Sequence, residues 1–423
     1  MRRLLALALA LAACPAAALD DPALATAVRE ALDRSPEVAR IRAEVAAESQ
    51  RAPQVGAFPD PTLTLGIQND SFNQINIGVM ETSFWQVMVT QPIPWPGKRD
   101  ARAAAAQAQA TAAGARLGRA QLDVEAAVTS AWVELLLVRG QLTLLGKLEA
   151  LWREAEALVR ARYGIGAVPQ SDLVRAQLEL TRLATQRLGL EASARARTQE
   201  LNRWRGHPLD EPVEMARPLA EADLPDLPTP ERAVADAEER SPDLAAARLA
   251  EAAAGRRVEV AQRDRYPDLA VGAAVMFRGS LDPMWAATVS VGLPVFSKRG
   301  AAVTETTERR KAESEGVEAV ARVVRLRAAE RQTALSSVLA TLKLYREGLL
   351  VQSDAAVRAT MAQYRVGKVP FASVLESVRG LVADEGGFLD TQAQAQRVAI
   401  AARAVSLDPA GGLAAGLGGG GIP

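Results

Sequence analysis

"ARYGIGAVPQSDLVRAQ" at residues 161–177 has a counterpart 201 residues further along the chain, "AQYRVGKVPFASVLESV" at residues 362–378. Each copy has a Tyr, a Gly three residues later and a Pro three residues after that. Gly permits the positive φ of a tight turn, and Pro fits the start of a helix but not its interior. Each copy therefore predicts a helix that stops sharply and a second helix that returns antiparallel.

The repeat extends well beyond this motif. Three further landmarks recur in the same order, at offsets of 200 to 208 residues: "AVREALDRSPEVA" (27–39) as "AVADAEERSPDLA" (233–245), Phe58-Pro59-Asp60 as Tyr266-Pro267-Asp268, and "PIPWPGKR" (92–99) as "GLPVFSKR" (292–299). Chance matches would rarely keep this order and spacing. The chain is therefore an internal duplication, with a unit too long and copies too few for a solenoid.

Prolines mark the element boundaries in both halves. Each half has one Pro-free stretch of more than 70 residues and one of 38, bounded by Pro96, Pro169 and Pro208 and by Pro294, Pro370 and Pro409. A helix of about 65 residues is roughly 100 Å long and needs a partner along its length. The pattern thus predicts a long helix and a shorter return helix in each half.

Apolar residues at alternating spacings of three and four supply a seam for such partners. They are Val128, Ala131, Leu135, Val138, Leu142 and Leu145 in the first half, and Leu335, Val338, Leu342, Tyr345 and Leu349 in the second. This seam predicts coiled-coil packing. The alternative, an amphipathic helix on a globular core, is weaker because aromatic residues make up only 4% of the chain.

Four short segments alternate apolar with small or polar residues, which is the period of a β-strand. Their apolar positions are Leu63, Leu65 and Ile67; Trp85, Val87 and Val89; Leu269, Val271, Ala273, Val275 and Phe277; and Trp285, Ala287, Val289, Val291, Leu293 and Val295. One interpretation is a soluble sheet packed on helices. The other is a set of outer-membrane barrel strands, apolar toward lipid, with aromatic residues near their ends.

Export favours the barrel interpretation. Arg2 and Arg3 precede the apolar run Leu4–Ala13, which fits a signal peptide and is too short to span a bilayer. "LAAC" resembles a lipidation site at Cys14, whereas Ala16–Ala18 offers an ordinary cleavage site, so the signal ends at residue 13 or residue 18.

Four strands cannot close a barrel, and lipid does not tolerate an open edge. Several chains must share one, and three chains would give twelve strands.

Composition excludes several classes of protein. The chain has 50 basic and 50 acidic residues, one His and one Cys. Balanced charge gives no support for nucleic-acid binding. His207 stands alone in a Pro-rich connector, so neither a catalytic pair nor a Cys/His metal cluster can be assembled. We therefore expect no enzymatic activity, no resident metal and no cofactor.

The duplicated strand–strand–long helix–tip–return helix plan resembles the TolC family of outer-membrane efflux channels. The resemblance covers nearly all of residues 20–408 and is carried by "RSPEVA"/"RSPDLA", "QPIPWPGKR" and the two tips. It implies a trimer with a twelve-stranded β-barrel in the outer membrane, continued by a periplasmic α-helical coiled-coil tunnel. The expected parts are a first repeat at 20–206, a connector at 207–230, a second repeat at 231–408 and a flexible tail at 409–423.

The resemblance also implies roles for residues at the tips. Contact with a periplasmic adaptor protein would fall on Tyr163, Gly164, Gly166, Pro169, Gly367 and Pro370. The periplasmic gate would fall on Ser171, Asp172, Tyr364, Lys368, Ser373 and Glu376. Our hypothesis is that Tyr364 and Lys368 link to Asp172 or to a neighbouring helix in the closed state. Only Glu376 keeps the charge of the two family tip carboxylates, so the charge ring is altered.

The implied function is a passive exit duct for substrates delivered by an inner-membrane pump and a periplasmic adaptor. The "QPIPWPGKR" segment resembles the branch associated with heavy-metal cation export, while a multidrug or type I secretion duct is the alternative. A lipid-anchored structural coiled coil tethered through Cys14 is an interpretation of another class. It would explain the helices but not four amphipathic strands in matching places.

Overall fold

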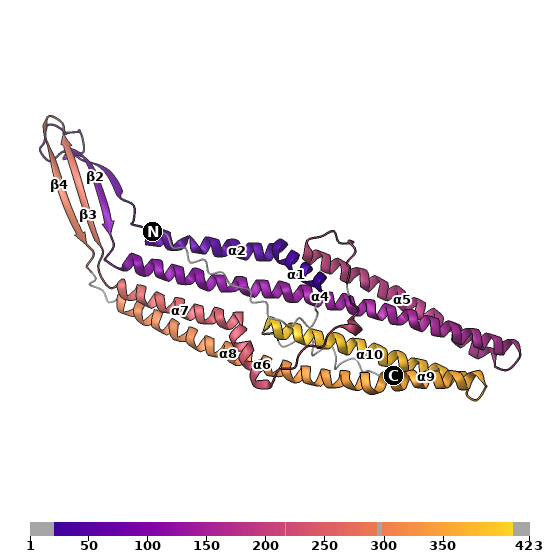
Figure 1. Cartoon of the computed structure of the whole chain (residues 1–423). Helices are drawn as coiled ribbons and strands as arrows, with labels where there is room; N and C mark the ends of the chain where they lie inside the picture. The colour runs from indigo at the N-terminus through magenta and orange to yellow at the C-terminus, as the bar shows by residue number, and fades with distance from the viewer. Residues whose placement is uncertain (1–20, 216, 294–297, 409–423) are drawn as a thin grey trace. The chain divides into compact units, whose positions relative to one another are not determined.

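The structure, a computed structural model, describes residues 21–215, 217–293 and 298–408. The predicted signal segment with Cys14 and the Gly-rich tail lie outside these residues. The described chain is mainly helical and has one four-stranded sheet (Figure 1). It divides into two units: a first unit from residues 1–38, 120–241 and 323–423, and a second unit from residues 39–119 and 242–322.

The sheet of the second unit joins the two halves of the duplication. Its strands are β1 (Thr62–Gln68), β2 (Phe84–Ile93), β3 (Leu269–Arg278) and β4 (Leu281–Val291). They lie in the order β1-β2-β3-β4, and every neighbouring pair is antiparallel. β2 of the first half thus pairs with β3 of the second half. β1 and β4 are edge strands, each with one side unpaired in the described chain.

The predicted alternation places the large apolar residues on one face of this sheet. Leu65 lies opposite Val87, Val87 opposite Val275, and Val275 opposite Trp285. These four side chains are exposed, Leu65 by 72% and Trp285 by 80%. The other face has small and polar residues such as Gly272, together with Met88, Met276 and Met284. The sheet therefore presents a continuous apolar face that no part of the described chain covers.

Helices of the second unit begin at equivalent positions in the two halves. α2 (Pro36–Ser49), which starts in the first unit, and α7 (Pro242–Arg263) each have a Pro as their first residue, where its missing N–H costs nothing. The short α3 (Arg51–Gly56) precedes β1. The long helices α4 (Lys98–Gly164) and α8 (Lys298–Leu344) start at lysines related by the 200-residue offset.

In the first unit, α4 ends at the first tip and α5 (Gln170–Arg205) returns from it. α9 (Leu350–Arg365) and α10 (Phe371–Ala404) form the second hairpin. α1 (Pro22–Arg34), η1 (Leu219–Glu221) and α6 (Pro230–Arg240) complete this unit. Asp21 caps α1 by accepting a hydrogen bond from the Ala23 N–H at 2.9 Å.

The predicted seam of α4 is buried along most of its length. Val128, Leu135 and Leu145 are 0–2% exposed, and only Leu142 is half-buried. Among the described helices, α4 alone is long and apolar enough to cross a membrane, but 56% of its most apolar window is buried in the structure. That burial is typical of a core helix, so packing accounts for its apolarity.

The seam of the second half is wrong at its last residue, because Leu349 is 42% exposed. A π-helical turn, η2 (Tyr345–Leu349), separates α8 from α9. A π turn holds an extra residue and so rotates the residues after it around the helix axis. Tyr345 packs edge-on against Phe388 with ring centroids 6.4 Å apart, and a Cβ at Gly387 would lie 2.4 Å from its hydroxyl. The missing side chain of Gly387 therefore makes room for this turn.

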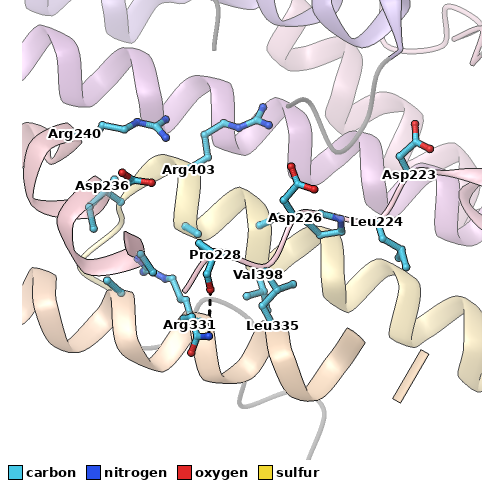
Figure 2. Close-up of a pocket in the computed structure, with 18 residues that line it drawn as sticks. Asp223, Leu224, Asp226, Pro228, Asp236, Arg240, Arg331, Leu335, Val398 and Arg403 are labelled. Carbon is cyan, nitrogen blue, oxygen red and sulfur yellow. Dashed lines mark hydrogen bonds between the residues drawn. The ribbon is translucent and has the colours of Figure 1, made fainter. Parts of the chain in front are cut away.

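The connector is bound to α10 by buried amides. Gln392 donates to the Ala222 carbonyl at 2.9 Å and Gln396 to the Asp223 carbonyl at 2.8 Å. A cavity of about 390 Å³ is lined by residues of the connector, α6, α8 and α10, and Figure 2 shows these side chains. At its wall Gln332 donates to the Pro228 carbonyl at 3.3 Å. Its lining has equal numbers of acids and bases: Asp223, Asp226, Asp236, Arg240, Arg331 and Arg403. This balance favours no charge class of ligand.

Candidate functional site

The two hairpin tips of the first unit close with the same turn. The Gly166 N–H donates to the Tyr163 carbonyl at 2.9 Å, and the Gly367 N–H donates to the Tyr364 carbonyl at 3.0 Å. In each tip the next N–H reaches back five residues, and both glycines have positive φ, +72° and +74°. This is the Schellman ending of a helix. Gly164 differs, since it is the last residue of α4 and has no positive φ.

The return helices also start alike. Pro169 and Pro370 are the N-cap residues of α5 and α10, with nearly equal backbone angles. The N–H groups of Asp172 and Ser373 each donate to the preceding Pro carbonyl at 3.1 Å. The prediction that each Pro begins a return helix is confirmed.

The two equivalent tyrosines have opposite surroundings. Tyr163 is 42% exposed, whereas Tyr364 is 1% exposed. The Tyr364 ring lies 5.7 Å from that of Phe371, which in turn meets Trp152 edge-on at 6.3 Å. This aromatic cluster ties α4, α9 and α10 together close behind the second tip.

Arg162 clamps the second tip from the first. Its Nη1 donates to the Tyr364 carbonyl at 2.6 Å, and its guanidinium lies 4.9 Å from the centre of the Tyr364 ring. A Cβ on Gly367 would lie 3.0 Å from its Nη2. A cation at the last carbonyls of a helix stabilises its C-terminus, and here the cation belongs to the other hairpin.

The Tyr364 hydroxyl is buried and has no hydrogen-bond partner among the described residues. Burial raises the pKa of this hydroxyl, Arg162 opposes the shift, and the charge of Asp172 adds to it. Asp172 itself lies 4.0 Å from Arg175 on its own helix. The Tyr364 hydroxyl is therefore a buried donor. The Asp172 carboxylate is close enough to affect its pKa but does not accept a hydrogen bond from it.

Ion pairs also join the two hairpins, one at the last residue of α9 and one further along the return helices. Arg365 of α9 pairs with Glu154 of α4. Glu179 of α5 accepts from Arg379 of α10 at 2.6 Å and from Arg182 at 2.6 Å. Exposed pairs of this kind contribute only about 0–1 kcal/mol each. They set register between helices without locking them.

A second cluster lies in the other unit, where the sheet meets the long helices. The Trp95 ring stacks on that of Tyr266 with centroids 5.6 Å apart, and the backbone N–H of Trp95 donates to Asp268 at 2.9 Å. The Lys98 ammonium, 3% exposed, lies 2.9 Å from Asp268 and donates to the Tyr266 carbonyl at 2.7 Å. The "QPIPWPGKR" segment of the first half thus binds the Tyr-Pro-Asp landmark of the second half.

Comparison with known proteins identifies the family that has this duplicated architecture. A family model described as outer membrane efflux protein matches residues 27–207 and 233–407. The chain belongs to the outer membrane efflux protein family. No curated protein matches it.

Solved structures share the fold of this family member at low identity. The outer-membrane channel OprN is 20% identical, with a TM-score of 0.77, and the match covers 92% of this chain and 91% of that one. VceC from Vibrio cholerae is 17% identical, with a TM-score of 0.75 and coverage of 91% and 96%. CusC is 14% identical, with a TM-score of 0.77 and coverage of 92% and 93%.

The predicted TolC-type fold and outer-membrane location are thereby confirmed. Proteins of this family are efflux channels and not enzymes. The one His of this efflux channel has a structural contact, since His207 Nδ1 lies 3.0 Å from Glu211. Among the described residues, no group of three His, Cys, Asp or Glu side chains is placed to hold a metal.

The structure brings only some of the predicted gate residues together. Asp172 of the first tip lies close enough to Tyr364 of the second tip for its charge to act on the Tyr364 hydroxyl. Lys368, Ser171 and Glu376 are exposed and Ser373 is half-buried. No side-chain hydrogen bond or ion pair of Lys368 or Glu376 occurs among the described residues, so a link from Lys368 to Asp172 is not made within one chain.

Sequence analysis missed Arg162, Trp152 and Phe371. It compared positions that the two tips share, and Arg162 is aligned with Gln363 of the second tip. The sequence carries no clear signal for Arg162, since each tip has a cation next to its Tyr: Arg162 directly before Tyr163, and Arg365 directly after Tyr364.

Proposed function

We propose that three copies of this channel close one barrel through their sheet edges and form the exit duct of a tripartite efflux assembly. The observation that carries this proposal is the sheet, which has two unpaired edges and an uncovered apolar face. In lipid an open edge leaves backbone groups unsatisfied, whereas closure satisfies them all. Three four-stranded sheets give twelve strands, an even number within the range of bacterial barrels.

The tips are proposed to contact a periplasmic adaptor, and an inner-membrane pump would supply the energy. Each tip exposes apolar side chains at its turn: Tyr163 by 42%, Ile165 by 80% and Val366 by 69%. Apolar residues exposed together are typical of a surface that another protein covers. We assign contact with the adaptor to these turns, including Gly164, Gly166, Pro169, Gly367 and Pro370.

The same tips are proposed to form the gate. A buried hydroxyl without a partner costs about 1–3 kcal/mol, so Tyr364 would gain from an acceptor that a movement of the tip helices brings to it. Asp172 is the carboxylate whose charge already reaches it. In the closed state we assign this link to Tyr364 and Asp172, with Lys368, Ser171, Ser373 and Glu376 lining the constriction.

Heavy-metal cations are the proposed substrate, on the resemblance of residues 91–99 to that branch of the family. The test deletes the gene and compares growth on copper, zinc, cobalt and nickel salts with growth on hydrophobic drugs and detergents. Sensitivity confined to metal salts, restored by the intact gene, is the expected result. Sensitivity confined to drugs would replace the metal assignment with a multidrug duct.

A further inference from the structure

One contact of the second unit links the two halves of the duplication. Lys98 is the first residue of α4 in the first half, and Asp268 directly precedes β3 in the second half. Their charged atoms lie 2.9 Å apart, and Lys98 is 3% exposed. The pair holds the start of a long helix against the start of a strand that pairs with β2.

One contact inside each half occurs in both halves at this corner. Arg99 donates to the Gly56 carbonyl at 3.1 Å, shortly before Phe58-Pro59-Asp60. Arg299 donates to the Arg265 carbonyl at 2.6 Å, directly before Tyr266-Pro267-Asp268, so the two acceptors differ by one position. The duplication therefore keeps the arginine after each lysine bound to the segment before the matching landmark.

The ion pair between Lys98 and Asp268, which joins the two halves, has no second copy in the described chain. Its counterpart would join Lys298, the first residue of α8, to Asp60, just before β1. Both side chains are exposed, and neither makes a hydrogen bond or ion pair among the described residues. β1 and β4 lie at opposite edges of the sheet, so these two residues of one chain do not meet there. A second copy of the chain can supply each with its partner.

The internal offsets also give the register of such a contact. Val89 lies opposite Ala273, Val87 opposite Val275, and Thr90 opposite Gly272. Moving β2 forward by 200 residues and β3 back by 208 converts these pairs into Val289–Leu65, Ala287–Ile67 and Ser290–Thr64. This register follows from the two offsets alone, without regard to residue type. It nevertheless places apolar residues opposite apolar residues and polar residues opposite polar residues. A shift by one residue would lose this match.

We propose that β4 of one copy pairs with β1 of the next in this register, and that Lys298 and Asp60 form an ion pair across the interface. The proposal rests on the proposed trimer and adds the residues that join its subunits. Charge complementarity and the repeated corner geometry both identify the occupant of the open edge as another copy of this chain.

The register is tested by disulfide formation in the full-length channel purified in detergent. Directly opposed residues have Cα atoms about 4.5–5.5 Å apart, within the range a disulfide spans. The double variant Leu65→Cys with Val289→Cys should give covalent dimers and trimers on non-reducing gels after mild oxidation. The control, Leu63→Cys with Ala287→Cys, is four residues out of register, about 13 Å, and should stay monomeric.

The outcomes separate this proposal from the proposed function. Light scattering first establishes whether each variant is a trimer. Trimers that cross-link only in the control pair, or in neither pair, overturn the register while leaving the trimeric duct in place. A channel that remains monomeric in every preparation overturns the proposed trimer itself.

The ion pair has its own test, the heat resistance of the trimer on gels with sodium dodecyl sulfate. Lys298→Asp and Asp60→Lys should each lower the temperature at which the trimer dissociates, because each puts like charges together. The double exchange should restore it, and Lys311→Asp, an exposed lysine further along α8, should leave it unchanged. Single exchanges that behave like Lys311→Asp overturn the pair.

Discussion

At the scale of single residues, Arg162 accounts for the link between the tips. It donates to the Tyr364 carbonyl and lies over the Tyr364 ring, whereas among the described residues its neighbour Arg160 pairs with Glu156 on its own helix. The difference between these two arginines shows why charge near a tip is a poor guide by itself. An arginine links the two tips only when its guanidinium reaches the other hairpin, as that of Arg162 does.

Arg162→Ala is expected to loosen the second tip. A hydrogen bond from a charged group contributes about 1.5–3 kcal/mol and a cation–π contact about 0.5–1 kcal/mol. A loss of about 2 kcal/mol would speed amide exchange at Gly367 and Lys368 roughly thirtyfold. Hydrogen exchange with mass spectrometry measures this. Arg160→Ala is the control and should change exchange less than about threefold, since such helix pairs contribute only about 0.3–0.5 kcal/mol.

Because of Tyr364, the stability of the folded channel should depend on pH in the alkaline range. Burial, with the charge of Asp172, raises the pKa of its hydroxyl above the ordinary value of 10.0. The unfolded chain therefore loses this proton first, and the free energy of unfolding falls as pH rises above about 10. Below that pH the stabilisation is fully present.

Thermal unfolding followed at several pH values tests this dependence. Tyr364→Phe should remove part of the decline above pH about 10. Tyr163→Phe is the matched control, because Tyr163 is exposed, and its decline should equal that of the unaltered channel. Equal slopes for all three proteins would show that Tyr364 ionises as freely when folded as when unfolded.

At the scale of elements, the tips show which glycines a turn requires. Gly166 and Gly367 hold the positive φ that ends each long helix, while Gly164 stays helical. The repeat already separates Gly164 from Gly166, because Gly166 aligns with Gly367 whereas Gly164 aligns with Arg365. The backbone angles agree with this difference in position.

Gly367→Ala and Gly164→Ala should therefore have opposite effects on stability. An alanine at 367 would be forced into the left-handed region at about 1–2 kcal/mol and would press on Arg162. A Cβ at 164 meets nothing within 4 Å, and Ala is the better helix former by up to about 1 kcal/mol. Melting temperatures in detergent should fall for the first variant and hold or rise for the second. A fall of equal size in both would contradict the turn assignment.

The π turn marks a limit of prediction from periodicity. Leu335 and Leu342 are buried as the spacing predicts, but Leu349 is exposed beyond the extra residue of η2. Nothing in the local spacing announces this turn. Gly387 on another helix leaves room for Tyr345 of this turn, and such a contact across helices cannot be derived from one segment.

At the scale of the whole molecule, the duplication made most of the fold predictable. Proline positions located the helices, and alternation located the strands and their apolar face. The pairing of β2 with β3 could not be derived, because it joins residues of different halves such as Val87 and Val275. The Arg162 clamp was unpredictable for the same reason, since Tyr364 lies 202 residues away. Contacts inside a segment were predictable, and contacts between distant segments were not.

The most direct test of a channel gated at its tips is the single-channel conductance of the purified protein in planar lipid bilayers. We expect discrete conductance steps that become larger in Arg162→Ala and in Asp172→Ala combined with Tyr364→Phe, with Arg160→Ala unchanged. Steps of equal size in all these variants would contradict the gate at the tips. The absence of any steps from folded, inserted protein would contradict the channel itself.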